Sequence, residues 1–328
     1  MKTHRRCLVI AASALLAMPS AAFSQVRKAY RLGVLSIDDN PRDTIWIEFV
    51  MELARFGFVE GQNLTVLPSF IGRDGTTAET AASNLLPLRV DAIYVVAGTA
   101  GVQAAMLATS TIPIVMLTSS DPVGDGLVAS LRQPGGNVTG NAIFGPELLA
   151  KRLQILVEIT DRPRQVAFLT TTRSPYAFRP RNQQYLAAAA QRLGTSAQVF
   201  RIDSIDEIDS VIAEIGRLRL PVLVDTTSLF YIHAKRLGEL VVQHRLPAIG
   251  DGRRYAEAGF LASYGQDYHD LARKCARYVA RIFQGADPKE LPVELATKFE
   301  MFLNLRTAAT LGVTVPRSLI LGATAVIR

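Results

Sequence analysis

Residues 91–122 read DAIYVVAGTAGVQAAMLATSTIPIVMLTSSDP. The two apolar runs at 92–97 and 112–117 are short and rich in branched residues, which is typical of buried strands. Between them, the alanine-rich stretch at 100–109 has a composition that favours a helix. A strand, a helix and a second strand at this spacing predict two parallel strands joined by a crossover helix. This stretch therefore predicts an α/β fold whose parallel sheet is covered by helices on both faces.

The same alternation extends in both directions along the chain. On the N-terminal side it predicts strands at 30–37 and 64–70 and helices at 44–56 and 77–86. The pattern restarts after a boundary near residues 140–146. The strands predicted there are 165–170, 197–202, 221–225, 247–250 and 259–264. Helices are predicted at 180–193 and 229–245, and a third helix is predicted to begin at the capping-box pair Ser204 and Glu207. Two such units predict two doubly wound, Rossmann-like lobes with a cleft between them. A further predicted helix at 267–284, followed by an extended link, indicates that the chain crosses between the lobes more than once.

The first 24 residues have the three-part layout of a secretory signal. The start is positively charged, residues 8–18 form an uncharged apolar run, and residues 22–24 (AFS) supply the small residues of a cleavage site. The apolar run has 11 residues, whereas a membrane-spanning helix needs about 20. We therefore predict a cleavable signal peptide at 1–24 and a periplasmic mature protein that does not span the membrane.

Charge and cysteine content narrow the possible functions. The net charge of the chain is +7, and removal of the signal takes away three positive charges and leaves +4. The remaining basic residues are scattered among acidic ones, so we expect no nucleic-acid binding. Cys7 precedes the apolar run and is therefore misplaced for lipidation, while the adjacent Arg5 and Arg6 leave the Tat route open beside the Sec route. The other cysteine, Cys275, has helical spacing to apolar neighbours, which predicts a buried structural thiol.

Short polar loops follow the predicted strands in both halves, at the sheet edge where open parallel sheets bind ligands. Residues 98–100 begin a helix, and its free backbone N–H groups can bind a carboxylate. Either Asp121 or Asp225 can pair with an ammonium group, and aromatic residues near the loops can line the cleft. Each loop alone is also an ordinary turn or cap, so the prediction rests on their recurrence in both lobes. The predicted ligand-binding residues are Ser36, Gly98, Thr99, Ala100, Ser119, Ser120, Asp121, Phe144, Thr171, Tyr176, Asp225, Thr227, Tyr255 and Tyr264.

No catalytic or metal-binding motif accompanies these loops. The sequence contains no H-E-x-x-H, C-x-x-C or G-x-S-x-G pattern. The three histidines after the signal, His233, His244 and His269, fall in predicted helices, and no group of His, Cys and acidic residues has metal-binding spacing. We therefore predict a binding protein and no enzyme, with no metal and no cofactor.

Several motifs of the mature chain carry a resemblance to a known family. GFVEGQNL at 57–64 is similar to a characteristic turn of that family, and the most distinctive match combines TIPIV at 111–115, DPVG at 121–124, GLVASL at 126–131 and PGGNVTG at 134–140. The match continues with LPAI at 246–249, SYG at 263–265, LPVE at 291–294 and TKFE at 297–300. On these motifs the whole mature chain resembles the ABC-transporter substrate-binding proteins of the tryptophan/tyrosine-binding type.

The resemblance implies the type I periplasmic-binding fold, in which three crossovers join two α/β lobes and a ligand is enclosed between them. It implies a first lobe of 28–141 with 265–293 and a second lobe of 142–264 with 294–328, and cleft-lining loops at Gly98, Thr99, Ser119, Ser120 and Asp121. We expect a monomer that closes around a small polar ligand, an amino acid or a related carboxylate, and delivers it to a membrane permease. A ligand sensor that feeds a signalling partner and a periplasmic enzyme on the same fold are the alternatives.

Overall fold

The strands of the N-terminal half form a six-stranded parallel sheet. The structure, a computed structural model, describes residues 28–37, 44–143, 145–172, 174 and 179–328. The strands are β1 (Tyr30–Ser36), β2 (Leu64–Phe70), β3 (Ala92–Val96), β4 (Ile114–Met116), β5 (Val138–Ala142) and the late strand β11 (Glu294–Leu295), in the spatial order β11-β5-β4-β3-β1-β2.

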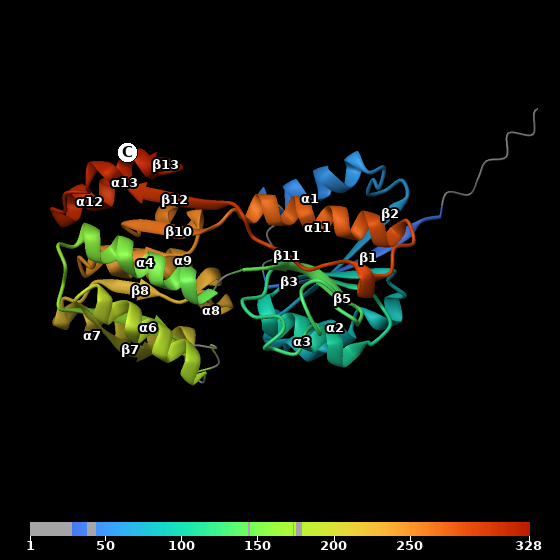
Figure 1. The fold of residues 1–328 in the computed structure, drawn as a ribbon, viewed down its shortest axis with the longest axis horizontal. Helices are drawn as coiled ribbons and strands as arrows, with labels where there is room; N and C mark the ends of the chain where they lie inside the picture. The colour runs from blue at the N-terminus through green and yellow to red at the C-terminus, as the bar shows by residue number, and fades with distance from the viewer. Residues whose placement is uncertain (1–27, 38–43, 144, 173, 175–178) are drawn as a thin grey trace, which may run out of the picture.

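Helices cover this sheet on both faces, as Figure 1 shows. Helices α1 (Thr44–Arg55) and α11 (Tyr268–Phe283) lie side by side over one face, where Phe49 and Leu53 meet Leu271 and Cys275 in one apolar core. Helices α2 (Ala78–Ser83) and α3 (Gly98–Ala108) cover the other face. Strand residues point alternately into these two cores, because successive side chains of a strand face opposite sides.

A seven-stranded sheet forms the second lobe. Its strands are β6 (Gln165–Thr170), β7 (Ser196–Arg201), β8 (Val222–Val224), β9 (Ala248–Gly250), β10 (Ala262–Gln266), β12 (Phe299–Asn304) and β13 (Ala325–Ile327), in the order β13-β12-β10-β9-β8-β6-β7. Strands β10 and β12 are antiparallel, and the other paired strands of this sheet are parallel. One face carries α4 (Gly145–Ile159), α6 (Pro180–Arg192), α12 (Leu305–Leu311) and α13 (Arg317–Gly322), and the other carries α7 (Ile208–Leu218), α8 (Ser228–Ile232), α9 (Ala234–Gln243) and α10 (Arg253–Glu257).

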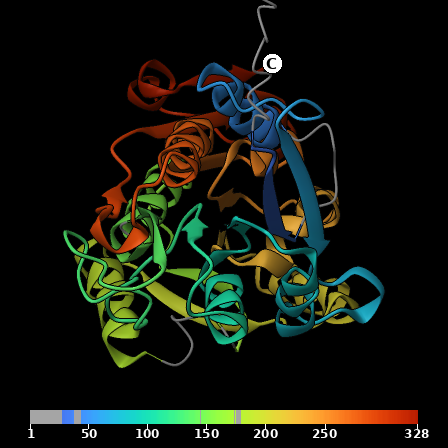
Figure 2. The same ribbon diagram turned by 90° about the vertical axis from the view of Figure 1, so that its right-hand side faces the viewer.

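The chain passes between the two sheets three times, from β5 to α4, from β10 to α11 and from β11 to β12. The lobes lie end to end in Figure 1, so one lies behind the other in the view along the long axis (Figure 2). The predicted fold class, two doubly wound lobes joined by three crossovers, is therefore confirmed. Strand pairing places residues up to Gln266 in the second sheet and Glu294–Leu295 in the first sheet. The exact residues at which the lobes were predicted to begin and end therefore stay a prediction.

Two features of the sequence prediction need separate mention. The single helix expected at 229–245 is two helices, because the backbone of His233 (φ −97°, ψ 19°) ends α8 and precedes α9. The predicted signal peptide lies outside the described residues. Within the described part of the chain, no helix is both long enough and apolar enough to span a membrane.

Position 140, at the centre of β5, requires glycine because of both its backbone angle and its surroundings. Its φ is +127°, and a Cβ placed on it would lie 2.2 Å from the backbone oxygen of Met116 on β4. We expect Gly140→Ala to lower the free energy of unfolding by about 2–3 kcal/mol, because alanine adds both backbone strain and a steric clash. Chemical denaturation measures this change.

Gly136→Ala is the matched control, since a Cβ there meets nothing within 4 Å and its φ is not positive. Equal denaturation midpoints for the two variants would contradict the role given to Gly140.

Candidate functional site

The loops after β3 and β4 bring two predicted hydroxyls together in the first lobe. Gly98 begins α3 with φ +60°, and the preceding Ala97 gives this helix no side-chain cap. The hydroxyl oxygens of Thr99 and Ser119 are 3.1 Å apart, and the Thr99 hydroxyl donates to Oδ2 of Asp125 at 3.4 Å. Ser119 is buried. The start of α3 and the loop after β4 therefore form one polar patch.

Arg179 of the second lobe reaches this patch. It precedes α6, and its guanidinium group donates to Asp121 Oδ2 at 3.3 Å and to Asp125. The Asp125 side chain is only 3% exposed, whereas the side chain of Asp121 is 48% exposed and also accepts a bond from the backbone N–H of Gly124 at 2.9 Å. The two carboxylates and the guanidinium group thus form an ion-pair cluster that joins the two lobes.

The sequence reasoning selected Asp121 but missed Asp125 and Arg179. Arg179 lies 54 residues from Asp125 along the chain, so no local spacing links them. A weak signal was present, because Asp125 follows Asp121 by only four residues.

The equivalent loops of the second lobe meet at Asp225, which is 2% exposed. Its carboxylate accepts bonds from the Thr170 hydroxyl at 2.7 Å, from the Ser174 hydroxyl and from the backbone N–H of Thr226 at 2.7 Å. Burial raises the pKa of Asp225, and these bonds and the charge of Arg152 oppose that rise. All of these donors belong to the second lobe, so Asp225 holds the loops of that lobe together, whereas Asp121 pairs with a residue of the other lobe.

Arg152 is a buried cation beside this network. It is 3% exposed on α4, and its guanidinium group donates to the carbonyl oxygen of Val224 at 3.2 Å and to the Thr226 hydroxyl at 3.0 Å. Its charge therefore acts on the loop that follows β8, next to Asp225.

The remaining predicted residues lie in varied positions. Thr227 caps α8 by accepting a bond from the N–H of Phe230 at 3.4 Å, Tyr255 is 1% exposed and packs edge-on against Phe260, and Tyr264 stacks on Phe299 beside the crossovers. Ala100 is exposed, Ser120 is half-buried, Ser36 and Thr171 are buried, and Phe144 and Tyr176 lie outside the described residues. The ligand-binding roles of all fourteen residues remain predictions.

Two side chains near the crossovers, those of Asn141 and Tyr268, form hydrogen bonds with other segments of the chain. Asn141 on β5 donates from Nδ2 to the carbonyl oxygens of Leu117 at 3.2 Å and of Leu271 at 3.1 Å, and it lies 3.0 Å from the Cys275 sulfur. The Tyr268 hydroxyl donates to Asp251 across the lobes at 3.1 Å. Burial raises the pKa of the Cys275 thiol, so this group stays protonated and unreactive. The prediction of a buried structural thiol is confirmed.

Several buried polar atoms near the crossovers have no hydrogen-bond partner among the described residues. They are Thr118 Oγ1, Asn141 Oδ1, Ser263 Oγ and Gln266 Nε2. Buried polar atoms are normally paired with protein or water. These four atoms can therefore still form a hydrogen bond, for example to a buried water molecule.

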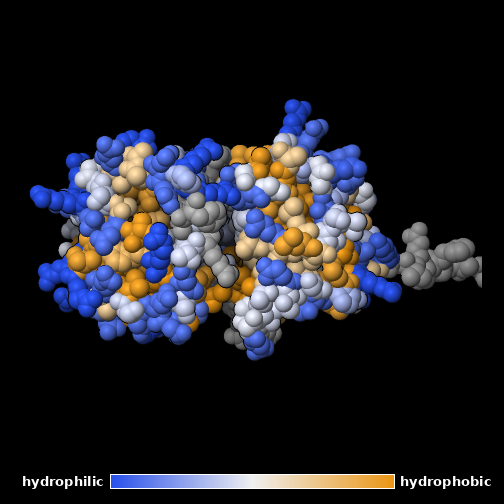
Figure 3. Space-filling model, turned by 90° about the horizontal axis from the view of Figure 1, so that it is seen from below, coloured by the Kyte–Doolittle hydropathy of each residue, from blue (hydrophilic) through white to orange (hydrophobic). Residues whose placement is uncertain are grey.

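One face of the molecule is mixed in character. Figure 3 shows hydrophilic and hydrophobic residues interspersed over both lobes. The most exposed large apolar side chains among the described residues, Leu107 at 81% and Leu321 at 76%, lie on different lobes. Single exposed apolar residues of this kind are normal on protein surfaces.

One family model matches most of this chain. The family described as ABC transporter substrate binding protein matches residues 53–327. A tyrosine-binding protein of Clostridioides difficile (strain R20291) is 25% identical over 295 residues, which cover 87% of this chain and 81% of that protein.

Two solved structures show the same fold. The ABC domain in complex with L-Trp from Streptococcus pneumonia has a TM-score of 0.80 at 24% identity and covers 92% of this chain and 100% of that chain. A conserved domain protein of Vibrio cholerae has a TM-score of 0.81 at 25% identity and covers 91% of this chain and 100% of that chain. With two α/β lobes, three crossovers and a family match over most of its length, this chain belongs to the ABC transporter substrate-binding protein family.

Proposed function

We propose that this protein is the extracytoplasmic solute-binding protein of an ABC-type uptake system. In this proposal the signal at 1–24 directs export, and the mature protein captures a small polar ligand and delivers it to a membrane permease. The observation that carries the proposal is the polar patch of Thr99, Ser119, Asp121 and Asp125, which Arg179 reaches from the other lobe. A patch that both lobes contact has the composition of a ligand site that closes by hinge motion.

The chemistry of the patch fits an amino acid. The first N–H groups of α3, with the Thr99 and Ser119 hydroxyls, supply neutral donors for a carboxylate at a helix N-terminus. Asp121 pairs with Arg179 and accepts a bond from Gly124, but its side chain is 48% exposed and can also bind an ammonium group. Asp225, in contrast, is buried and already accepts three bonds. Relatives described as a tyrosine-binding protein and as a complex with L-Trp make an aromatic amino acid the first ligand to test.

Ligand binding favours the closed state because only that state provides contacts from both lobes at once. The three crossovers then act as the hinge. The unpaired buried atoms of Thr118, Asn141, Ser263 and Gln266 lie near this hinge, where a ligand or ordered water can satisfy them.

Two substitutions test the location of the ligand. We expect Thr99→Pro, which removes a donor N–H and the hydroxyl, and Asp121→Ala, which removes the negative charge, each to weaken binding of tryptophan or tyrosine by about 10-fold. A single hydrogen bond to a charged group contributes about 1.5–3 kcal/mol, which gives a change of this size or larger. Isothermal titration calorimetry measures the dissociation constants.

Asp206→Ala is the matched control, because Asp206 is an exposed acid on the second lobe. Unchanged affinity in both Thr99→Pro and Asp121→Ala would remove the ligand from this patch. Turnover of the added amino acid, in place of stoichiometric binding, would contradict the proposal of a transport protein.

A further inference from the structure

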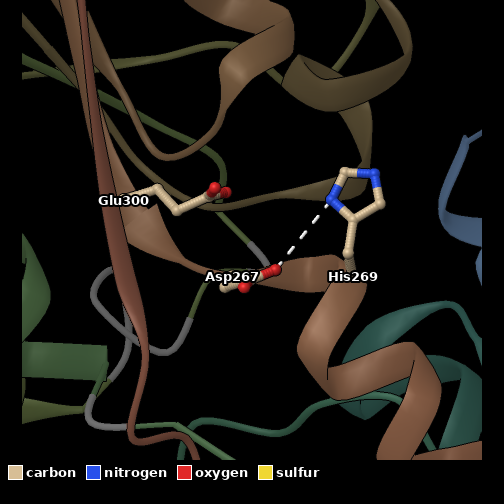
Figure 4. A group of neighbouring side chains, drawn as sticks. All are labelled: Asp267, His269 and Glu300. Atoms are coloured by element: carbon tan, nitrogen blue, oxygen red, sulfur yellow. Dashed lines mark ion pairs between the residues drawn. The ribbon is translucent and has the colours of Figure 1, made fainter. Parts of the chain in front are cut away.

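Three side chains with metal-binding atoms meet where two crossovers run together. Asp267 caps the N-terminus of α11, His269 lies in the first turn of that helix, and Glu300 lies on β12 (Figure 4). One ligand atom from each residue lies within 4.8 Å of the others. Glu300 is 33 residues from Asp267 along the chain, so the three residues have no metal-binding spacing in the sequence, and the fold alone brings them together.

The imidazole of His269 is oriented by a neighbour. Its Nε2 atom lies 3.0 Å from the hydroxyl oxygen of Thr44, at the start of α1. Its Nδ1 atom lies on the other side of the ring, 3.9 Å from Asp267 Oδ1. In the tautomer whose Nε2–H donates to Thr44, Nδ1 carries no hydrogen and faces the carboxylates. Metal-binding histidines are typically held by a second hydrogen bond of this kind.

The two carboxylates lack a cation of their own on the side that faces His269. Glu300 is half-buried, and its side chain has no hydrogen bond or ion pair among the described residues. Arg273 comes within 4.0 Å of Asp267 Oδ2, but it pairs more closely with Glu48 at 2.7 Å. Arg253, the other nearby cation, pairs with Glu257 at 2.6 Å. The negative charges of Asp267 and Glu300 therefore repel each other, and a cation bound between them would be attracted to both and offset this repulsion.

We propose that Asp267, His269 and Glu300 form a binding site for a divalent cation of the zinc type. One imidazole nitrogen and two carboxylate oxygens suit Zn²⁺, which leaves a fourth position for water. Mg²⁺ and Ca²⁺ prefer sites made of oxygen alone, so they bind this set less well. Zinc–ligand distances are about 2.0–2.2 Å, so the three side chains need only small rotations to close around the ion.

The location gives the ion a mechanical role. Glu300 belongs to the sheet of the second lobe, while His269 belongs to a helix that packs on the first lobe. The backbone N–H of Asp267 already donates to the carbonyl oxygen of Lys298 at 2.9 Å, which links the same two crossovers. A bound cation adds a second link at this point and stiffens the hinge.

Titration of metal-free protein with ZnCl₂ tests the site. We expect one equivalent of zinc to bind, and MgCl₂ to compete weakly. Glu300→Gln and His269→Gln should each weaken zinc binding by at least 10-fold, because each removes a ligand. Thr44→Val should weaken it less, because it removes only the bond that orients His269. A competing chromogenic chelator reports the affinities.

Glu290→Gln and His244→Gln are the matched controls, since Glu290 and His244 lie away from the cluster. Thermal unfolding without zinc verifies that every variant folds. If Glu300→Gln does not fold, His269→Gln still provides an independent measurement. Absence of zinc binding to the unmodified protein, or equal binding by the site variants and their controls, would overturn the proposal. No solute is added, so this result does not depend on the proposed transport function.

Discussion

Replacing Arg152 with methionine is expected to lower the free energy of unfolding by about 3–5 kcal/mol. The substitution keeps much of the side-chain length but removes a guanidinium group that is 3% exposed. It leaves the Thr226 hydroxyl without the bond it accepts at 3.0 Å and the carbonyl oxygen of Val224 without the one at 3.2 Å. It also removes a positive charge that acts on the buried carboxylate of Asp225. Each buried acceptor left without its partner costs about 1–3 kcal/mol, so the two lost bonds account for most of the expected loss.

Chemical denaturation followed by circular dichroism measures the loss. Arg192→Met on the exposed side of α6 is the matched control, and it should change stability by less than about 0.5 kcal/mol. Adding Asp225→Asn to Arg152→Met should recover part of the loss, because the second change removes the buried negative charge. A loss below about 1 kcal/mol for Arg152→Met alone would show that Arg152 does not compensate Asp225.

The second large effect is expected at the ion pair that joins the lobes. Arg179→Ala should weaken ligand binding by about 100-fold, if the ligand binds between the lobes as proposed. In the closed state this change leaves Asp125, whose side chain is 3% exposed, without its cation. Opening the lobes lets water reach Asp125, so the substitution favours the open state by roughly 3 kcal/mol. Apparent affinity falls in proportion to the population of the closed state.

Calorimetry gives the affinity, and small-angle X-ray scattering gives the population of open molecules without any ligand. Arg181→Ala is the control, because Arg181 lies two residues further along the chain, in the first turn of α6, and is exposed. If Arg179→Ala left the scattering profile of the free protein and its ligand affinity unchanged, the ion pair would have no role in closure.

The strands of both lobes could be predicted because buried parallel strands carry their own signal. The runs at 30–37, 64–70 and 165–170 are apolar and bounded by turns, and they match β1, β2 and β6 closely. Strands β11 and β12 were not predicted from such runs. Strand β11 has two residues, and β12 pairs antiparallel with β10 in a register that only the third crossover sets.

The candidate sites show the same limit. The Thr99 and Ser119 hydroxyls could be selected from the sequence, because each follows a predicted strand and strand ends meet at one edge of a sheet. Arg179 and Glu300 could not be selected. Their partners are 58 residues away at Asp121 and 33 residues away at Asp267, and such pairs arise from the way the crossovers place one lobe against the other.

The buried thiol of Cys275 has a practical consequence. The other cysteine, Cys7, lies within residues 1–24, so a chain without that segment presents no reactive sulfur to a dye. Cysteines introduced at Leu107 on the first lobe and Val199 on the second, which are 81% and 45% exposed, would therefore be the sole positions that accept fluorophores. The native sequence thus already provides a labelling background in which two dyes, one on each lobe, report lobe movement as a change in energy transfer.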